Sequence, residues 1–168
     1  MIREGVYLDV GQMFRTVENN TKDTVRVLDG RAWLMGQWVA LKAPLVVSVP
    51  PSDLLMDRMD GIYLVVDARD HARHSYIELI PGTPSKTPKM PDMTIGGELW
   101  KGYLISVVTR KAKSTSITVA NIRYTVGETS EFGFASGLLN GLDPSAYIED
   151  FRRRCNDWFD QWSMSMQN

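Results

Sequence analysis

The stretch GIYLVVDARDHARHSYIELI, residues 61–80, decides the fold. It begins with a continuous apolar run, 62–66, which is typical of a buried β-strand. The polar segment 67–74 follows, and the apolar residues resume at 76–80. Two apolar runs separated by a short polar stretch predict a β-hairpin with a polar tip.

The segments on both sides of this hairpin also favour strands. Short apolar runs occupy residues 25–28, 32–39 and 45–49, with breaks at Gly30 and Gly36, and Pro50 and Pro51 end the third run. Beyond the hairpin, residues 99–108 and 116–124 have strand character and are separated by a turn at 109–115. The sequence therefore predicts a mainly β protein, with a single β-sandwich or barrel-like domain over residues 1–126.

A proline-rich arm, residues 81–94, interrupts the strands. Four of the eight prolines lie within the eleven residues PGTPSKTPKMP: Pro81, Pro84, Pro88 and Pro91. Such a segment cannot pair inside a sheet and is expected to be extended. It is either a surface crossover that packs on its own domain or an arm that lies over an adjacent subunit.

In the last part of the chain, the spacing of the apolar residues changes to that of a helix. Gly127, Gly133, Gly137 and Gly141 predict a glycine-rich junction over residues 127–142. Asp143 and Pro144 then resemble the N-cap and first position of an amphipathic helix over 143–168. Its apolar positions are spaced by three and four residues; with Ile148 at heptad position a, Phe151 falls at d, Cys155 at a, Trp158 at d and Trp162 at a. The stripe either packs on the β domain or binds a partner or a second copy.

Composition limits the classes of function. The chain has 168 residues, 43% of them hydrophobic and 23% charged, which is typical of a globular protein. Its net charge of −1 provides no general attraction to nucleic acid or to anionic membranes. The single cysteine excludes a disulfide framework and a Cys-rich zinc site. We expect no signal peptide and no transmembrane helix, since no apolar stretch is long enough.

Few residues suggest catalysis. His71 and His74 are the only histidines and lie beside Asp67, a pattern compatible with a metal or phosphoesterase site, although a solvated turn fits the interleaved arginines better. Asp57 and Asp60 precede the apolar run and are typical of turn residues rather than paired catalytic carboxylates. Cys155 has no neighbouring histidine and is expected to be a small buried hydrophobe. We therefore predict that the protein is not an enzyme, with no cofactor and no metal.

Two further groups are candidate binding residues. The first is a basic strip that contains no acid from 99 to 127: Lys101, Arg110, Lys111, Lys113 and Arg123. Such a strip can contact nucleic acid, but an ordinary protein-contact or solvated surface is the favoured interpretation. The second is the set of tryptophans Trp33, Trp38 and Trp100, which either stack on sugar rings or, as we expect, pack in the core.

The order of several motifs resembles one family. The pattern begins with Gly30, Ala32 and Gly36 in a G-x-A-x-x-x-G element and continues with Arg58, Asp60 and IYLVVDARD. PGTPSKTPKMP, ELWKGYLISVV and SITVANI follow in that order. The stretch 25–124 resembles the N-terminal domain of bacteriophage baseplate and tail-fibre proteins, such as the upper-baseplate proteins of phages of Gram-positive bacteria. In that family a helix with an aromatic pair, here Trp158 and Phe159, commonly follows.

The resemblance implies a structural adaptor of the virion, assembled in the host cytoplasm. Such a domain docks on the tail baseplate, forms homo-oligomers, often trimers, and carries fibres or receptor-binding proteins through its helix. Phage-derived injection particles use similar adaptors. Asn121, Arg123 and Tyr124 replace the acid that usually ends the family's last strand, and no receptor-binding head is expected after the helix. Attachment of another protein is therefore the implied role, with no nucleic acid or membrane as partner.

The sequence thus predicts two sets of partner-binding residues. Anchors on the helix are Ile148, Phe151, Trp158, Phe159 and Trp162, and contacts from the arm are Pro84, Pro88 and Pro91. The alternative function is a carbohydrate- or receptor-binding module for host attachment, which would use the exposed aromatic residues of the β domain.

Overall fold

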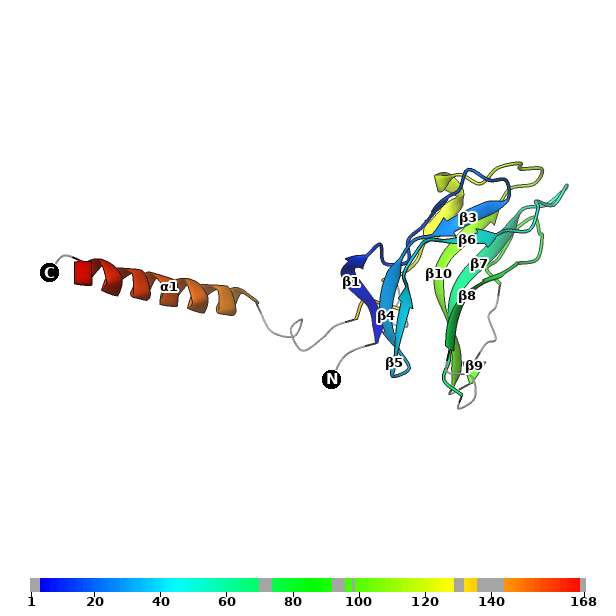
Figure 1. The fold of residues 1–168 in the computed structure, drawn as a ribbon. Helices are drawn as coiled ribbons and strands as arrows, with labels where there is room; N and C mark the ends of the chain where they lie inside the picture. The colour runs from blue at the N-terminus through cyan, green and yellow to red at the C-terminus, as the bar shows by residue number, and fades with distance from the viewer. Residues whose placement is uncertain are drawn as a thin grey trace. The chain divides into compact units, whose positions relative to one another are not determined.

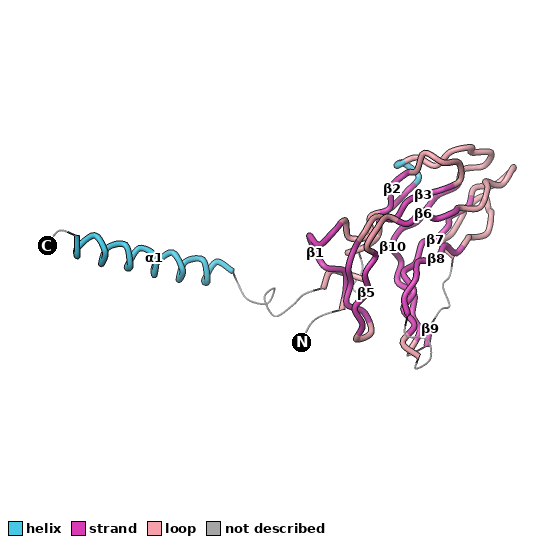
Figure 2. Tube along the Cα trace, in the orientation of Figure 1, coloured by secondary structure: helices cyan, strands magenta, loops and turns pink. Residues whose placement is uncertain are grey.

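The computed structural model describes residues 4–69, 74–91, 96–97, 99–128, 132–135 and 144–166. The chain divides into two compact units. One is the β unit, residues 3–135, and the other contains residues 136–168 with the first two residues of the chain. The protein is mainly β with one C-terminal helix, as the sequence predicts (Figures 1 and 2).

The largest sheet contains the predicted hairpin. Its strand order is β11-β10-β7-β8, and a short strand, β9, also pairs with β10. Gly61 pairs with Ile80 and Asp67 with His74, which confirms the hairpin, although residues 70–73 of its tip lie outside the described residues. The bounds are β7 Arg58–Asp67, β8 His74–Ile80, β9 Gly96–Gly97, β10 Trp100–Arg110 and β11 Ile122–Tyr124.

Two three-stranded antiparallel sheets complete the β unit, in the orders β1-β4-β5 and β2-β3-β6. Over the described strands the three sheets stay separate, so the barrel form of the prediction is not observed. The bounds of these strands are β1 Gly5–Gly11, β2 Thr16–Glu18, β3 Thr24–Val27, β4 Gly30–Leu34, β5 Gln37–Leu41 and β6 Leu45–Ser48.

The structure corrects several expected strands. The run 32–39 is two strands, because Met35 and Gly36 both have positive φ, 51° and 70°, and form a tight turn between β4 and β5. Gly30 starts β4 instead of breaking it. Only Ile122–Tyr124 of the run 116–124 is a strand, after a 3₁₀ helix at Val119–Asn121. Sequence patterns missed β1 and β2, which are short and interrupted by charged residues.

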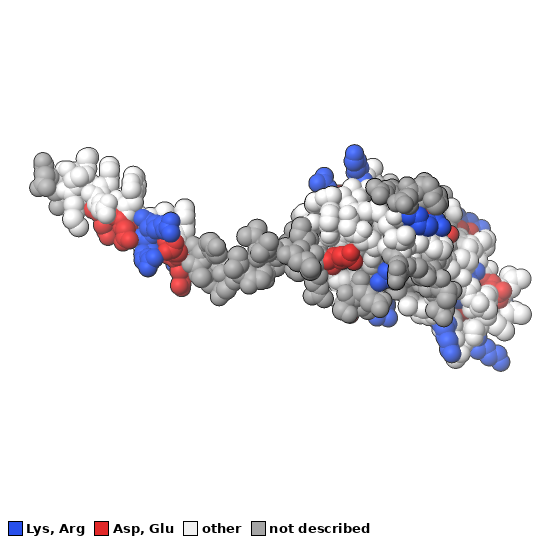
Figure 3. All heavy atoms as spheres, turned by 90° about the horizontal axis from the view of Figure 1, so that it is seen from below, with Lys and Arg blue, Asp and Glu red and all other residues white. Residues whose placement is uncertain are grey.

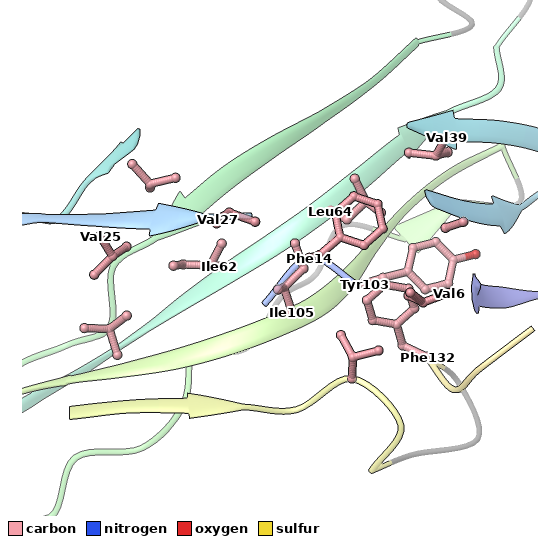
Figure 4. Close-up of a cluster of buried hydrophobic side chains, with 14 of the residues drawn as sticks. Val6, Phe14, Val25, Val27, Val39, Ile62, Leu64, Tyr103, Ile105 and Phe132 are labelled. Carbon is pink, nitrogen blue, oxygen red and sulfur yellow. The ribbon is translucent and has the colours of Figure 1, made fainter. Parts of the chain in front are cut away.

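The core lies between the large sheet and the two small ones. In Figure 4, Val25 and Val27 of β3 lie near Ile62 of β7, whereas Val6 and Val39 mark the opposite end. The core side chains alternate along the strands, as expected for two layers packed face to face. The fully buried members include Val6, Phe14, Val25, Val27, Ile62 and Ile105.

β7 is buried on both faces. Ile62 and Leu64 point into the core, whereas Tyr63 and Val65 lie on the opposite face and are 5% and 0% exposed. The Tyr63 hydroxyl donates a hydrogen bond to the carbonyl oxygen of Pro91 at 3.2 Å. The proline-rich segment therefore helps to cover the outer face of the large sheet, which explains why the sequence of β7 is continuously apolar.

Two buried ion pairs fix one end of the large sheet. Arg58 and Asp60 form a bidentate pair, with Nε–Oδ1 at 2.6 Å and Nη2–Oδ2 at 2.9 Å. The remaining Arg58 N–H groups donate to the carbonyl oxygens of Pro50 and Pro51. Arg110 lies opposite Arg58 in the register and pairs with Asp23. Such pairs are costly to break, because a buried charge is then left without a partner.

The β unit extends beyond residue 126. Val126 is buried, and Phe132 is 3% exposed and packs against the Tyr103 ring, with a centroid distance of 5.2 Å. Phe134 forms a bridge with Val6 of β1. Part of the predicted junction 127–142 therefore belongs to the β unit, whereas residues 136–143 lie outside the described residues.

Candidate functional site

The C-terminal helix, α1, spans Pro144–Met166 and has the start that the sequence predicts. Proline is favourable at the first helical position because that backbone N–H has no partner within the helix. Twenty-three residues form a rod roughly 35 Å long. Asp143, the expected N-cap, lies outside the described residues.

Seven apolar side chains form a single stripe along α1. At the helical rotation of 100° per residue, their positions fall within a sector about 100° wide. The charged residues occupy the remaining sector, and Met164 lies on the side opposite the stripe. We define the apolar stripe as Ile148, Phe151, Cys155, Trp158, Phe159, Trp162 and Met166.

The apolar stripe is exposed. Phe151 is 70% exposed and Trp158 is 65% exposed, while the rings of Phe159 and Trp162 contact each other with centroids 5.9 Å apart. Cys155 is also exposed, so the expectation of a buried cysteine is wrong. A continuous line of exposed aromatic side chains is typical of a helix that binds a groove or other helices.

One acidic residue on the polar side of α1 pairs with two arginines of the helix. Asp150 accepts a hydrogen bond from Arg153 at 2.6 Å and forms an ion pair with Arg154 at 2.9 Å, at helical spacings of three and four residues. The last charged residue of the chain is Asp160. Figure 3 accordingly shows the coloured atoms of the helix gathered along one part of its length and white atoms toward its C-terminal end.

The proline-rich segment is tied to its own domain. The Ser85 N–H donates to the Asp57 carbonyl oxygen at 2.9 Å, and the Gly82 N–H donates to Oδ1 of Asp60 at 3.0 Å. A Cβ atom at Gly82 would lie 2.0 Å from the Met59 carbonyl oxygen, so only glycine allows this close approach. These contacts match the crossover interpretation of the segment.

The predicted contacts of the arm are half-buried. Pro84, Pro88 and Pro91 are each partly covered, and the segment curls around a hollow of about 590 Å³ lined by its own residues, including Thr83 and Lys89. Partner binding by these prolines stays a prediction.

The basic strip does not form one surface. Arg110 is buried with Asp23, Lys111 bonds Asp57 at 2.9 Å, and Arg123 bonds Glu128 at 2.7 Å. The Lys101 ammonium lies 5.1 Å from the Tyr103 ring centroid, a cation–π contact, whereas Lys113 is exposed. Because the other four cations of the strip have partners, they give a nucleic-acid backbone no continuous positive track.

The three carboxylates near β7 are not brought together. Asp60 pairs with Arg58 at one end of the strand, and Asp67 pairs with Arg69 at the other, roughly 23 Å away along seven strand residues. The hydrogen bonds from the Arg69 side chain lower the pKa of Asp67 to about 2. Lys111 likewise lowers the pKa of Asp57. Each of the three acids is therefore paired with a cation.

The histidines of the hairpin are only partly described. His74 stacks on Tyr76 with ring centroids 5.4 Å apart, and His71 lies outside the described residues. Within the part of the chain that the structure describes, no three His, Cys, Asp or Glu side chains form a group that could hold a metal ion.

The tryptophans of the β unit differ in exposure. Trp38 is 66% exposed, so its expected place in the core is wrong, while Trp33 and Trp100 are half-buried. Arg69 lies over the Trp100 ring, 5.5 Å from its centroid. Tyr7, which the sequence analysis did not identify, stacks on Trp38. For the two tryptophans the sequence did hold a signal: a two-residue turn at Met35–Gly36 places Trp33 and Trp38 opposite each other in a hairpin.

Comparisons with protein-family models, with curated proteins and with solved structures gave no match. The resemblance to phage baseplate proteins therefore stays a prediction from the sequence motifs. No described helix has the length and apolar character needed to cross a membrane.

Proposed function

We propose that the protein is a non-enzymatic structural adaptor of a phage tail baseplate, or of a phage-derived injection particle, and that α1 assembles it into a homo-oligomer. The observation that carries the proposal is the exposed apolar stripe of α1. The β unit supplies the docking domain, and fibres or receptor-binding proteins are the further partners. The virion is the proposed location, and the link to phage tails comes from the motif order 25–124.

Burial of the apolar stripe provides the free energy for assembly. Full burial of an exposed side chain as large as Trp158 or Trp162 at an interface contributes roughly 2 kcal/mol or more to the free energy of association. Because the stripe follows heptad positions a and d from Ile148 to Trp162, copies of the helix can pack side by side. A trimer is the favoured state, as the family resemblance implies.

Cys155 offers a direct test, because it is the only cysteine and lies in the apolar stripe at position a. In a parallel helical bundle the Cys155 side chains of neighbouring copies meet, so mild oxidation should join copies by disulfides. A dimer allows complete cross-linking, whereas a trimer leaves about a third of the chains unlinked. Non-reducing gel electrophoresis at low protein concentration measures the fraction.

Two matched variants distinguish the contribution of the apolar stripe to assembly from that of the opposite side of the helix. Trp158→Ala should abolish the cross-link, whereas Met164→Ala, which removes an exposed apolar side chain from the opposite side, should leave it unchanged. No specific cross-link in the unmodified chain, or equal loss in both variants, would contradict assembly through the stripe.

One observation favours the alternative function, a carbohydrate- or receptor-binding module. Trp38 is exposed on the β unit and stacked on Tyr7.

A further inference from the structure

The outer face of the sheet β1-β4-β5 carries an aromatic platform, which we define as Tyr7, Trp33 and Trp38. The Tyr7 and Trp38 rings stack with centroids 5.2 Å apart and planes 9° from parallel. Trp33 meets Trp38 edge-on, at 5.5 Å and 76°. Three rings that hold one another in this way lose little conformational freedom when a ligand binds.

The local fold fixes this arrangement. β4 and β5 lie side by side (Figure 1). Trp33 and Trp38 are directly opposite in their register, next to the tight turn at Met35–Gly36. The adjacent residues Ala32 and Val39 point to the other face and are buried in the core. The tryptophans therefore cannot turn inward without loss of the core packing of both strands.

Trp38 remains mostly open to solvent despite its two aromatic contacts. Its exposed fraction of 66% contrasts with 3% for Val39, the next residue of the same strand. Clustered exposed aromatic side chains are typical of binding surfaces, in contrast to single exposed apolar residues.

A polar hollow lies at the other end of the same strands. It has a volume of about 340 Å³ and is lined by Val10, Asp29, Arg31 and Lys42, among others. Strand alternation places Arg31 on the same face as Trp33, with Cα atoms roughly 7 Å apart. Among the described side chains, no ion pair joins either cation to a carboxylate.

The residue between the aromatic and polar ends is small. Ala40 lies opposite Arg31 in the register and on the same face as Trp38. Because its side chain is only a methyl group, Ala40 does not block the path between the aromatic rings and the hollow. Along this face the aromatic platform is followed by Ala40 and then by the polar hollow, which contains two cations and one carboxylate.

These features fit a sugar better than a protein. A stable protein interface covers about 800 Å² on each partner, whereas the open aromatic surface here is essentially one indole ring, with the charged side chain of Arg31 on the same face of the sheet. A pyranose has an apolar C–H face that matches an aromatic ring and hydroxyls that need hydrogen-bonding partners.

From this arrangement we infer that the face binds an acidic oligosaccharide. One sugar ring stacks on Trp38, and the anionic group of the same or the next sugar contacts Arg31 and Lys42, with the Asp29 carboxylate available to accept hydroxyl hydrogen bonds. The excess of cations in the hollow selects the acidic ligand over a neutral one. Host attachment through a surface glycan goes beyond the adaptor role, and it uses a unit other than α1.

The test uses the full chain and an immobilised panel of tetrasaccharides in three groups: uronic-acid, phosphate-substituted and neutral. Binding is expected for acidic members only, and it should weaken as salt rises. Isothermal titration with the best-bound member then gives Kd. The uronic-acid and phosphate groups identify which anion is preferred. If no member binds, or if neutral members bind equally well, the proposal is overturned.

Variants locate the site. Trp38→Ala should weaken binding about tenfold or more, the effect of losing an aromatic anchor. Arg31→Gln should weaken it roughly fivefold, the effect of about one hydrogen bond. Met164→Ala, the control, removes an exposed apolar side chain of α1 outside the apolar stripe and should leave Kd unchanged. Both β-unit side chains point outward, so the fold is retained, and thermal melting verifies it.

Three outcomes separate this proposal from the assembly role of α1. Unchanged sugar binding in Trp38→Ala would overturn the saccharide site and leave assembly untouched. A lower oligomer mass in Trp38→Ala would also overturn it, because the platform would then be a protein interface. Loss of assembly in Trp158→Ala with normal sugar binding would concern α1 alone.

Discussion

The β unit and α1 satisfy their side chains in opposite ways. In the β unit the large apolar residues alternate into a shared core, and cations such as Arg58 have carboxylate and carbonyl partners inside the domain. In α1, Asp150 pairs with Arg153 and Arg154 along the helix, and the apolar stripe is exposed. The β unit has a hydrophobic core of its own, whereas α1 leaves its apolar stripe open to solvent.

This difference indicates where the stability and the assembly of the protein reside. A domain with a closed core folds through its own contacts, whereas an amphipathic helix gains most of its stability from packing of its apolar face. Substitutions in the β unit should therefore change unfolding, and those in the apolar stripe should change association.

The largest expected effect comes from the buried ion pair of the β unit. Asp60→Asn keeps the volume but leaves the Arg58 guanidinium, which is nearly fully buried, without a counter-charge. We expect a loss of about 3–5 kcal/mol in the free energy of unfolding. Urea denaturation followed by tryptophan fluorescence measures it. A loss below about 1 kcal/mol would mean that this pair does not support the β unit.

A matched pair of isoleucines compares the two regions directly. Ile62 is fully buried in β7 and Ile148 is 58% exposed in α1. Ile62→Ala should destabilise the β unit by roughly 3 kcal/mol through loss of apolar burial and formation of a cavity. Ile148→Ala should leave the melting of the β unit unchanged and weaken self-association. Equal effects of the two substitutions on β-unit melting would remove the distinction between the regions.

A pH-dependent effect is expected at the far end of β7. Hydrogen bonds from Arg69 lower the pKa of Asp67 from 3.8 to about 2. Ionised Asp67 therefore stabilises the folded state above pH 3.8, and this contribution is lost as the pH falls toward about 2. Asp67→Asn should be less stable than the natural chain at neutral pH, and the difference should disappear near pH 2. A pH-independent difference would contradict this ion pair.

The smallest effect is expected on the polar side of α1. Asp150→Asn removes two solvent-exposed ion pairs, with Arg153 and Arg154. Surface pairs at helical spacing contribute only about 0.3–0.5 kcal/mol each, so helix content by circular dichroism and oligomer mass should hardly change. Dissociation of the oligomer in this variant would show that the charged face, rather than the apolar stripe, carries assembly.

The sequence predicted the parts of the fold in which local pattern and tertiary environment agree. The run IYLVV with a polar tip predicted the β7–β8 hairpin, and the three-and-four spacing after Pro144 predicted α1. β1 was missed because it pairs with a strand far along the chain, with Gly5 opposite Trp33, and β2 because it has only three residues. Residues 116–118 form no strand, and the Thr118 N–H donates to Oδ1 of Asn121.

The candidate sites were predicted to different extents. Helical geometry is local, so the apolar stripe of α1 could be assigned from residue spacing alone. The aromatic platform could not, because it needs Tyr7 from β1 to meet Trp38 from β5 across an intervening strand. Exposure of Trp38 likewise depends on which face of β5 turns inward. Because Trp38 and Val39 are both apolar, the hydrophobic pattern did not determine which of the two faces the core.

The central claim is that the β unit is complete alone and that α1 joins copies of the chain. Light scattering of the 19.0 kDa chain, with and without truncation before Asp143, tests it most directly. We predict an oligomer, with the mass of a trimer, that becomes a folded monomer on truncation. Equal association states for the two forms, whether both monomeric or both oligomeric, would contradict it.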